Sequence, residues 1–189
     1  MANRAYLYFT DDVSALTSEQ HYKRADGSER VYMDSRHQLP LAWLLFFRPE
    51  HIWVVLDTEH GWYDMYFVRD WSSAKDEFLR RVPLLLSWFP NELSQSDVET
   101  FLGWLDMLIA NPNEKFLVID PHQVIEGSSP ETDSAPSIRS TLQSLEDATL
   151  SEQEKFERLD VWSNCKYSYN FLEQFDTVFG AYYGGYFEP

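Results

Sequence analysis

The chain has 189 residues, a length typical of one domain, and 44% of them are hydrophobic, which is enough for a core. It carries 31 acidic and 15 basic side chains, a net charge of −16, which repels phosphate backbones and argues against nucleic-acid binding. The apolar runs are too short to span a bilayer, and the single cysteine, Cys165, excludes a disulfide within the chain.

The first segments in chain order predict a strand, a loop and a helix. Ala5–Thr10 is rich in aromatic residues and predicts a strand. Asp11–Arg36 is polar and contains an Asp-Gly-Ser turn signal, so it predicts a long loop with a short helix near Ser18. Leu39–Phe47 is apolar almost throughout, and its length and Pro residue favour a short buried helix over a strand.

The predicted fold is organised around Ile52–Val68. Two apolar runs, rich in β-branched and aromatic residues, flank a short polar segment that ends in Gly61. This pattern is typical of a β-hairpin whose glycine occupies a turn position. Because most of the segments that follow predict helices, we expect an α+β fold with a small, mostly antiparallel sheet that is packed by helices.

The hairpin is followed by a predicted helix with a proline inside it. Ser72 or Ser73 can cap this helix, which runs to about Trp88, and Glu77 is one of two acids favourably near its positive end. Its apolar residues recur with a helical period. Pro83 lies within the periodic segment, so we expect a kink or a break into two pieces there.

A second helix and a strand are predicted between residues 96 and 120. Ser96 and Glu99 have the spacing of a capping box, and the apolar stripe behind them predicts a helix that ends near Asn111. Lys115–Asp120 combines β-branched and aromatic residues and is closed by a proline. It therefore predicts a short buried strand.

The C-terminal part predicts a linker and three helices. Glu126–Ser137 is rich in Gly, Ser, Pro and acids, so it predicts a flexible loop. Helices are expected over Ile138–Leu150, from the capping box Ser151–Glu154 to Ser163, and over Tyr167–Val178. The predicted organisation is an α+β core (residues 1–125), the acidic loop (126–137) and a helical extension that packs on the core (138–189), together one domain.

The sequence contains no strong catalytic or metal-binding motif. The motifs HExxH, GxxxxGK[ST], GxGxxG and GxSxG and a pair of CxxC motifs are all absent. The hairpin turn offers the best local cluster, because Asp57, Glu59, His60 and Asp64 could act as an acid–base pair or hold a metal. Turns also collect such residues for solubility alone. We therefore expect no metal and no cofactor, and keep these four residues as candidates for an enzyme.

Acidic residues concentrate in the C-terminal half and suggest an interaction surface. Residues 91–189 carry 5 basic and 18 acidic side chains, a net charge of −13. A solvated helix face explains such a pattern as well as a docking surface for a basic protein does. The tail adds aromatic residues, and the tail either folds back onto the core, forms a recognition surface or is disordered. The candidate partner-binding residues are Glu146, Asp147, Glu154, Glu157, Asp160, Tyr182, Tyr183 and Tyr186.

The opening residues Met1-Ala2-Asn3-Arg4-Ala5-Tyr6-Leu7-Tyr8 resemble the start of a family of uncharacterised bacterial proteins that begin MANR-x-YLY. In that family an apolar, proline-containing helix also follows after a loop, as Leu39-Pro40-Leu41 does here. The resemblance covers about a quarter of the chain and implies a bacterial cytoplasmic protein. It implies no catalytic residue.

These observations together favour a cytoplasmic, non-enzymatic protein-binding module. Its most specific form is an immunity-type inhibitor that neutralises a basic toxin, with charge speeding the encounter and aromatic residues holding the partner. The alternatives are an enzyme with a carboxylate and histidine site at the 57–64 turn, and a structural module that forms homodimers. We expect no nucleic acid and no membrane among the partners.

Overall fold

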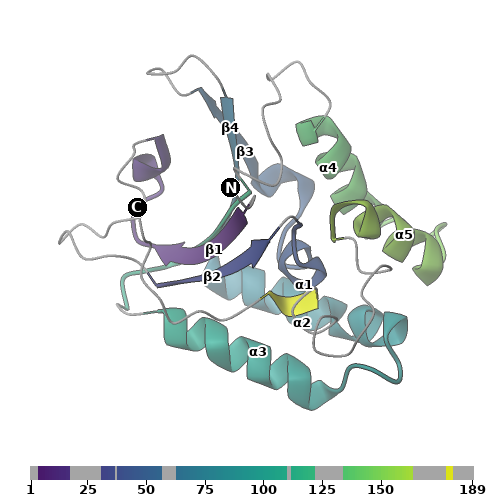
Figure 1. Ribbon diagram of the computed structural model, residues 1–189. Coiled ribbons are helices and arrows are strands. Elements are labelled where there is room, and N and C mark those ends of the chain that lie inside the picture. The colour runs from purple at the N-terminus through teal and green to yellow at the C-terminus, as the bar shows by residue number, and fades with distance from the viewer. Residues whose placement is uncertain are drawn as a thin grey trace.

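The computed structural model describes residues 4–17, 31–36, 38–56, 63–109, 112–121, 134–163 and 178–180. Within these residues, five strands form one antiparallel sheet in the order β2-β1-β5-β4-β3 (Figure 1). The strands are β1 (Arg4–Thr10), β2 (Tyr32–Arg36), β3 (Ile52–Leu56), β4 (Tyr63–Asp70) and β5 (Phe116–Asp120). With helices packed against this sheet, the predicted α+β fold is confirmed.

The same part of the chain contains five α-helices and two short 3₁₀ helices. These are α1 (Leu41–Leu44), α2 (Trp71–Trp88), α3 (Gln95–Leu108), α4 (Ser134–Ser144), α5 (Glu152–Ser163), η1 (Ser14–Thr17) and η2 (Pro49–His51). Figure 1 shows α1, α2 and α3 along one side of the sheet, with α4 and α5 together beyond the β3 edge. Of the described helices, none combines the length and apolar character needed to cross a membrane.

The predicted hairpin and the predicted buried strand are both confirmed. In the hairpin, Ile52 lies opposite Phe67 and Val54 lies opposite Met65, so β3 and β4 are antiparallel neighbours. Strand β5 lies in the middle of the sheet between β1 and β4. Its residues are buried from Leu117 to Asp120, which explains why the sequence reads there as a continuous apolar run.

The predicted loop over Asp11–Arg36 is wrong at its C-terminal end, which forms β2 and pairs with β1. Met33 packs in the main core, whereas Tyr32 packs on the opposite face of the sheet. The alternation of apolar and polar residues that indicates a strand is missing here, because the polar residues Asp34 and Ser35 are also buried. The short helix expected near Ser18 appears one turn earlier, as η1.

The predicted buried helix over Leu39–Phe47 is confirmed in a shorter form. Every residue of this segment is buried, but only α1 is α-helical, and turns follow it. The indole Nε1 of Trp43 donates a hydrogen bond of 2.7 Å to the carbonyl of Phe179. A residue near the C-terminal end of the chain is thus fixed against the centre of the core.

Helix α2 begins at Trp71 and is capped by Asp70, not by Ser72 or Ser73. The Asp70 carboxylate accepts a hydrogen bond of 3.1 Å from the backbone N–H of Ser73, which is the geometry of an N-cap. The helix continues through Pro83 to Trp88, so the expected break into two pieces does not occur. Pro83 is exposed, and its ring therefore displaces no core side chain.

The capping box of α3 lies two residues before the predicted one. The backbone N–H of Ser94 donates to Asp97 Oδ2 at 2.8 Å, and the backbone N–H of Asp97 donates to Ser94 Oγ at 3.4 Å. The same spacing recurs at Ser96 and Glu99, but only the upstream box is preceded by a buried apolar residue. Leu93 and Val98 both belong to the core, where they flank this box as a hydrophobic staple does.

Helix α4 differs from the prediction at both ends, whereas α5 begins at the predicted capping box. Helix α4 begins at Ser134, so the last residues of the predicted linker are helical, and it ends at Ser144. The capping box at Ser151 is confirmed, since its N–H donates to Glu154 Oε2 at 2.8 Å and the Glu154 N–H donates back to Ser151 Oγ at 3.2 Å. The rest of the linker and most of the predicted helix over Tyr167–Val178 lie outside the described residues.

The two faces of the sheet have different chemistry. One face packs against the helices in a single large apolar cluster. On the other, Asp34 of β2 and Asp120 of β5 both lie opposite Tyr6 of β1, so the three form one row across three strands. Both aspartates are buried and have interaction partners, while Tyr8 packs nearby against Leu16 of η1. This row is a structural feature that the sequence patterns did not indicate.

Two glycines provide opposite tests of the packing. Gly103 lies on α3, and a Cβ added there would meet no heavy atom within 4 Å. Gly180 has a φ of 79°, and a Cβ there would lie 2.6 Å from the buried Trp43 ring. We expect Gly103→Ala to raise the free energy of unfolding by roughly 0.5–1 kcal/mol. Gly180→Ala should lower the free energy of unfolding by about 1 kcal/mol or more, because the positive φ disfavours alanine and the methyl group would overlap the Trp43 ring.

Urea denaturation of the two variants beside the wild-type chain measures both effects. Because each variant adds one methyl group at a glycine, the pair is a matched comparison. An unchanged midpoint for Gly180→Ala would contradict the packing of residues 178–180 against Trp43.

Candidate functional site

The carboxylate and histidine cluster of the hairpin turn is not placed by the structure. Asp57, Glu59 and His60 lie outside the described residues. Asp64 is half-buried on β4, opposite Val55 of β3, and has an interaction partner. Among the described residues, no group of three or more His, Cys, Asp or Glu side chains is placed to hold a metal ion. The enzyme alternative therefore stays a prediction.

The aromatic tail is likewise beyond the described part, which includes only residues 178–180 of that region. Tyr182, Tyr183 and Tyr186 therefore stay predictions as partner-binding residues. The residues just before them are buried, and the ring of Phe179 lies 4.9 Å from the ring of Phe101. Residues 178–180, which precede the tail, therefore lie in the core between α1 and α3.

Three predicted partner-binding acids face outward at the C-terminal helices. Asp147, Glu154 and Glu157 are exposed. Asp147 follows α4 and accepts hydrogen bonds from Thr149, whereas Glu157 accepts one of 3.0 Å from Gln153. Each carboxylate therefore has a local partner that fixes its direction and leaves it open to solvent.

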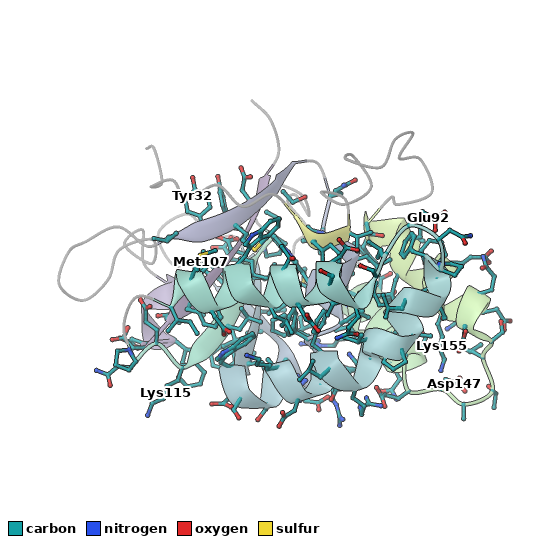
Figure 2. All side chains as sticks on the ribbon, turned by 90° about the horizontal axis from the view of Figure 1, so that it is seen from below. Tyr32, Glu92, Met107, Lys115, Asp147 and Lys155 are labelled. Atoms are coloured by element: carbon teal, nitrogen blue, oxygen red, sulfur yellow. The ribbon has the colours of Figure 1, made fainter. Side chains whose placement is uncertain are left out.

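Helical spacing places an exposed apolar residue among these acids. Glu154, Glu157 and Val161 are three and four residues apart, so they follow one face of α5. Val161 is 76% exposed, the most of the exposed large hydrophobic residues in the described part of the chain. We call Asp147, Glu154, Glu157 and Val161 the acidic face. Figure 2 labels Asp147 and the neighbouring Lys155 at one end of the molecule.

The other two predicted acids are used inside the fold. Asp160 is buried on α5 and has an interaction partner. Glu146 follows α4, and its Oε1 accepts hydrogen bonds from Arg81 at 2.6 Å and from Arg80 at 2.7 Å. Sequence reasoning treated Glu146 as one member of an acidic helix surface, but its charge is already balanced by two arginines of α2.

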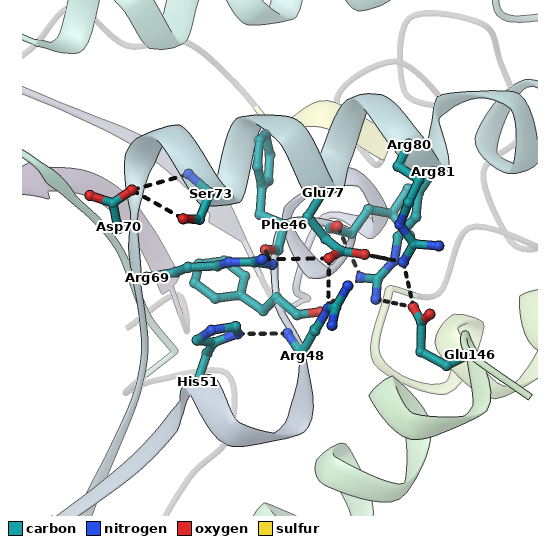
Figure 3. Close-up of polar contacts among 12 residues, drawn as sticks. Phe46, Arg48, His51, Arg69, Asp70, Ser73, Glu77, Arg80, Arg81 and Glu146 are labelled. Atoms are coloured by element: carbon teal, nitrogen blue, oxygen red, sulfur yellow. Dashed lines mark hydrogen bonds and ion pairs between the residues drawn. The ribbon is translucent and has the colours of Figure 1, made fainter.

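The centre of this ionic network is Glu77, a carboxylate buried on α2. Its Oε2 lies 2.6 Å from Arg48 Nε and 3.4 Å from Arg69 Nη2 (Figure 3). Its Oε1 contacts Arg80 and lies 3.0 Å from Arg81 Nε. Four guanidinium groups thus surround one carboxylate. We call Arg48, Arg69, Arg80, Arg81, Glu77 and Glu146 the arginine cluster.

The two most buried arginines also satisfy the backbone at the end of α1. Arg81 Nη1 donates to the carbonyls of Leu45 and Phe47 at 3.0 and 2.8 Å, and Arg69 Nη1 donates to the carbonyl of Phe46 at 2.7 Å. These carbonyls follow a helix C-terminus, where positive charge is favoured. The cluster therefore joins β4, α2, the segment after α1 and the α4–α5 turn.

The electrostatics of the cluster follow from burial and close charge. Burial alone would raise the pKa of Glu77, but the hydrogen bonds from Arg80 and Arg48 and the charge of Arg81 lower it from 4.5 to about 2. The pKa of His51 is lowered, first by burial and then by the charge of Arg69. His51 Nδ1 accepts a hydrogen bond of 3.0 Å from the Arg48 backbone N–H, which requires that nitrogen to be unprotonated.

No family model matches the chain, and neither the curated proteins nor the solved structures that were compared with it contain a match. The resemblance of the opening residues to a bacterial family therefore stays a prediction.

Glu77→Gln tests how strongly the fold depends on the central carboxylate. The substitution keeps the shape but leaves buried arginines without their negative partner, so we expect the free energy of unfolding to fall by about 3–5 kcal/mol. The control is Asp106→Asn, which removes an acid that is 54% exposed and pairs with Lys75. That control should change the free energy by less than about 1 kcal/mol. Equal losses in urea denaturation of the two variants would contradict the central role of Glu77.

The low pKa of Glu77 also predicts the response to acid. A carboxyl group whose pKa is lower in the folded state stabilises the fold above its unfolded pKa and loses that contribution as the pH falls. We expect the wild-type free energy of unfolding to decrease between about pH 5 and about pH 2. Glu77→Gln should show a shallower slope over the same range, because it has no carboxyl group to protonate there. Parallel slopes in pH-dependent denaturation would show that other acids account for the loss.

Proposed function

We propose that the chain is a non-enzymatic binding protein that docks a basic protein partner through the acidic face. The observation that carries this proposal is the environment of Val161, an apolar side chain that is 76% exposed on the same face as Glu154 and Glu157. An apolar centre with a charged rim is the usual arrangement of a protein–protein interface. Burying Val161 against a partner would remove its apolar surface from water.

Charge determines which kind of partner fits this face. Residues 146–163 carry six acidic and two basic side chains, and the whole chain has a net charge of −16. The two bases, Lys155 and Arg158, lie close enough to affect Asp147 but do not balance the acids. A field of this sign attracts a basic protein and speeds the encounter, while it repels acidic competitors.

The arginine cluster supports the same proposal by fixing the acidic face in place. Glu146 immediately precedes Asp147, and its bonds to Arg80 and Arg81 tie the α4–α5 turn to α2. The indole of Trp88 adds a bond of 2.9 Å to the carbonyl of Glu152 at the start of α5. A surface that is already ordered loses less entropy on binding.

The more specific form of the proposal is an immunity-type inhibitor of a basic toxin. The high negative charge and the acidic face suit rapid capture of a basic protein, which is what such an inhibitor needs. In this form, the tail residues Tyr182, Tyr183 and Tyr186 would add aromatic contacts to those of the acidic face.

The test is capture from a lysate of the source organism on immobilised wild-type chain and on Glu157→Lys/Val161→Asp. We expect the wild-type chain to capture a basic protein. The purified partner should bind the double variant with an affinity that is lower by about tenfold or more. Raising the salt concentration should slow association with the wild-type chain.

The matched control is Glu99→Lys, which reverses one exposed charge on α3 and leaves the acidic face intact. This control should retain binding. If no protein partner is recovered, or if the double variant binds the partner as the wild-type chain does, the proposal is wrong.

A further inference from the structure

The arginine cluster contains more donors than its own acids use. Within the described residues, the guanidinium of Arg48 contacts Glu77 through Nε alone, and no partner is seen for its two Nη groups. Arg80 uses Nη2 for both Glu77 and Glu146. The side chains of Arg48 and Arg80 are 41% and 51% exposed, so their remaining N–H groups are accessible from solvent.

These spare donors lie close together. Arg48 contacts one oxygen of the Glu77 carboxylate and Arg80 contacts the other, so both guanidinium groups border the same buried anion. Figure 3 shows the two groups beside that carboxylate, one from the segment after α1 and one from α2. Arg69 and Arg81 lie deeper and donate to backbone carbonyls.

The local charge is positive although the molecule is strongly acidic. Four arginines face the two carboxylates of Glu77 and Glu146. The exposed Glu50, which lies next to His51, reduces the excess to one positive charge and does not cancel it. A chain with a net charge of −16 thus holds a positive region at the junction of the sheet, α2 and the α4–α5 turn.

We propose that Arg48 and Arg80 form a binding site for a phosphate group. A guanidinium presents a planar fork of donors that matches the oxygens of phosphate, and two forks from different elements can engage several oxygens of one tetrahedral anion. A phosphate anion also offsets this excess charge, which a neutral ligand would not do. This site goes beyond the proposed partner surface, because its ligand has the opposite charge and its residues lie outside the acidic face.

The test is titration of the full chain with inorganic phosphate at constant ionic strength, followed by the NMR signals of His51 and by the melting temperature. We expect saturable shifts of the His51 signals and a rise in melting temperature with phosphate concentration, because phosphate binds the folded state. Phosphate charge beside the cluster should also raise the pKa of His51. Acetate, which offers one carboxylate fork, should bind more weakly.

The variants are Arg48→Gln and Arg80→Gln, with Arg158→Gln as the control that removes an equal charge from an exposed position on α5. Each of the first two should weaken phosphate binding by about tenfold or more, because each removes charge-assisted donors. The control should change it less than about twofold. If Arg48→Gln does not fold, Arg80→Gln provides the same test. The absence of saturable binding, or an equal loss in Arg158→Gln, would overturn the proposal.

Discussion

Glu77 imposes the constraint on which the rest of the structure depends, because a carboxylate buried on α2 must have compensating positive charge. Arg48, Arg69, Arg80 and Arg81 supply it from β4, from α2 and from the segment after α1. Two of these arginines, Arg69 and Arg81, also donate to the carbonyls that follow α1, which would otherwise be buried without donors. One charge therefore fixes how α2 lies on the sheet.

The C-terminal helices depend on the same constraint. Four arginines beside one glutamate leave an excess of positive charge, and Glu146 balances part of it from the α4–α5 turn. Apolar packing is not directional, whereas charge-assisted bonds have defined directions. The bond of 2.8 Å from Arg139 to the carbonyl of Ile52 acts in the same way between α4 and β3. The acidic face is positioned by bonds that its own residues do not make.

Patterns that are local in sequence predicted the fold well. The hairpin, the buried strand β5 and the capping box at Ser151 depend on residues a few positions apart, and all three are confirmed. The cap of α3 was wrong because two boxes share one spacing and only burial of Leu93 distinguishes them. The predicted place of Glu77 near the positive end of a helix is wrong, because α2 begins at Trp71 and has no acid in its first turn. Arg48, which contacts Glu77, and Glu146, which shares Arg80 and Arg81 with it, lie far away in sequence, so local spacing could not reveal the cluster.

Glu146 links the two proposed sites, since it belongs to the arginine cluster and immediately precedes Asp147 of the acidic face. Its Oε1 accepts from both Arg80 and Arg81. A phosphate group bound to the remaining N–H groups of Arg80 would balance part of the charge of that guanidinium, while the bond of Glu146 to the deeper Arg81, which is 3% exposed, would remain. The turn would then keep its place while the negative charge of Glu146 became less well neutralised. Because that charge adds to the acidic face, an anion at the cluster would strengthen the attraction of that face for a basic partner, a coupling that works equally in both directions.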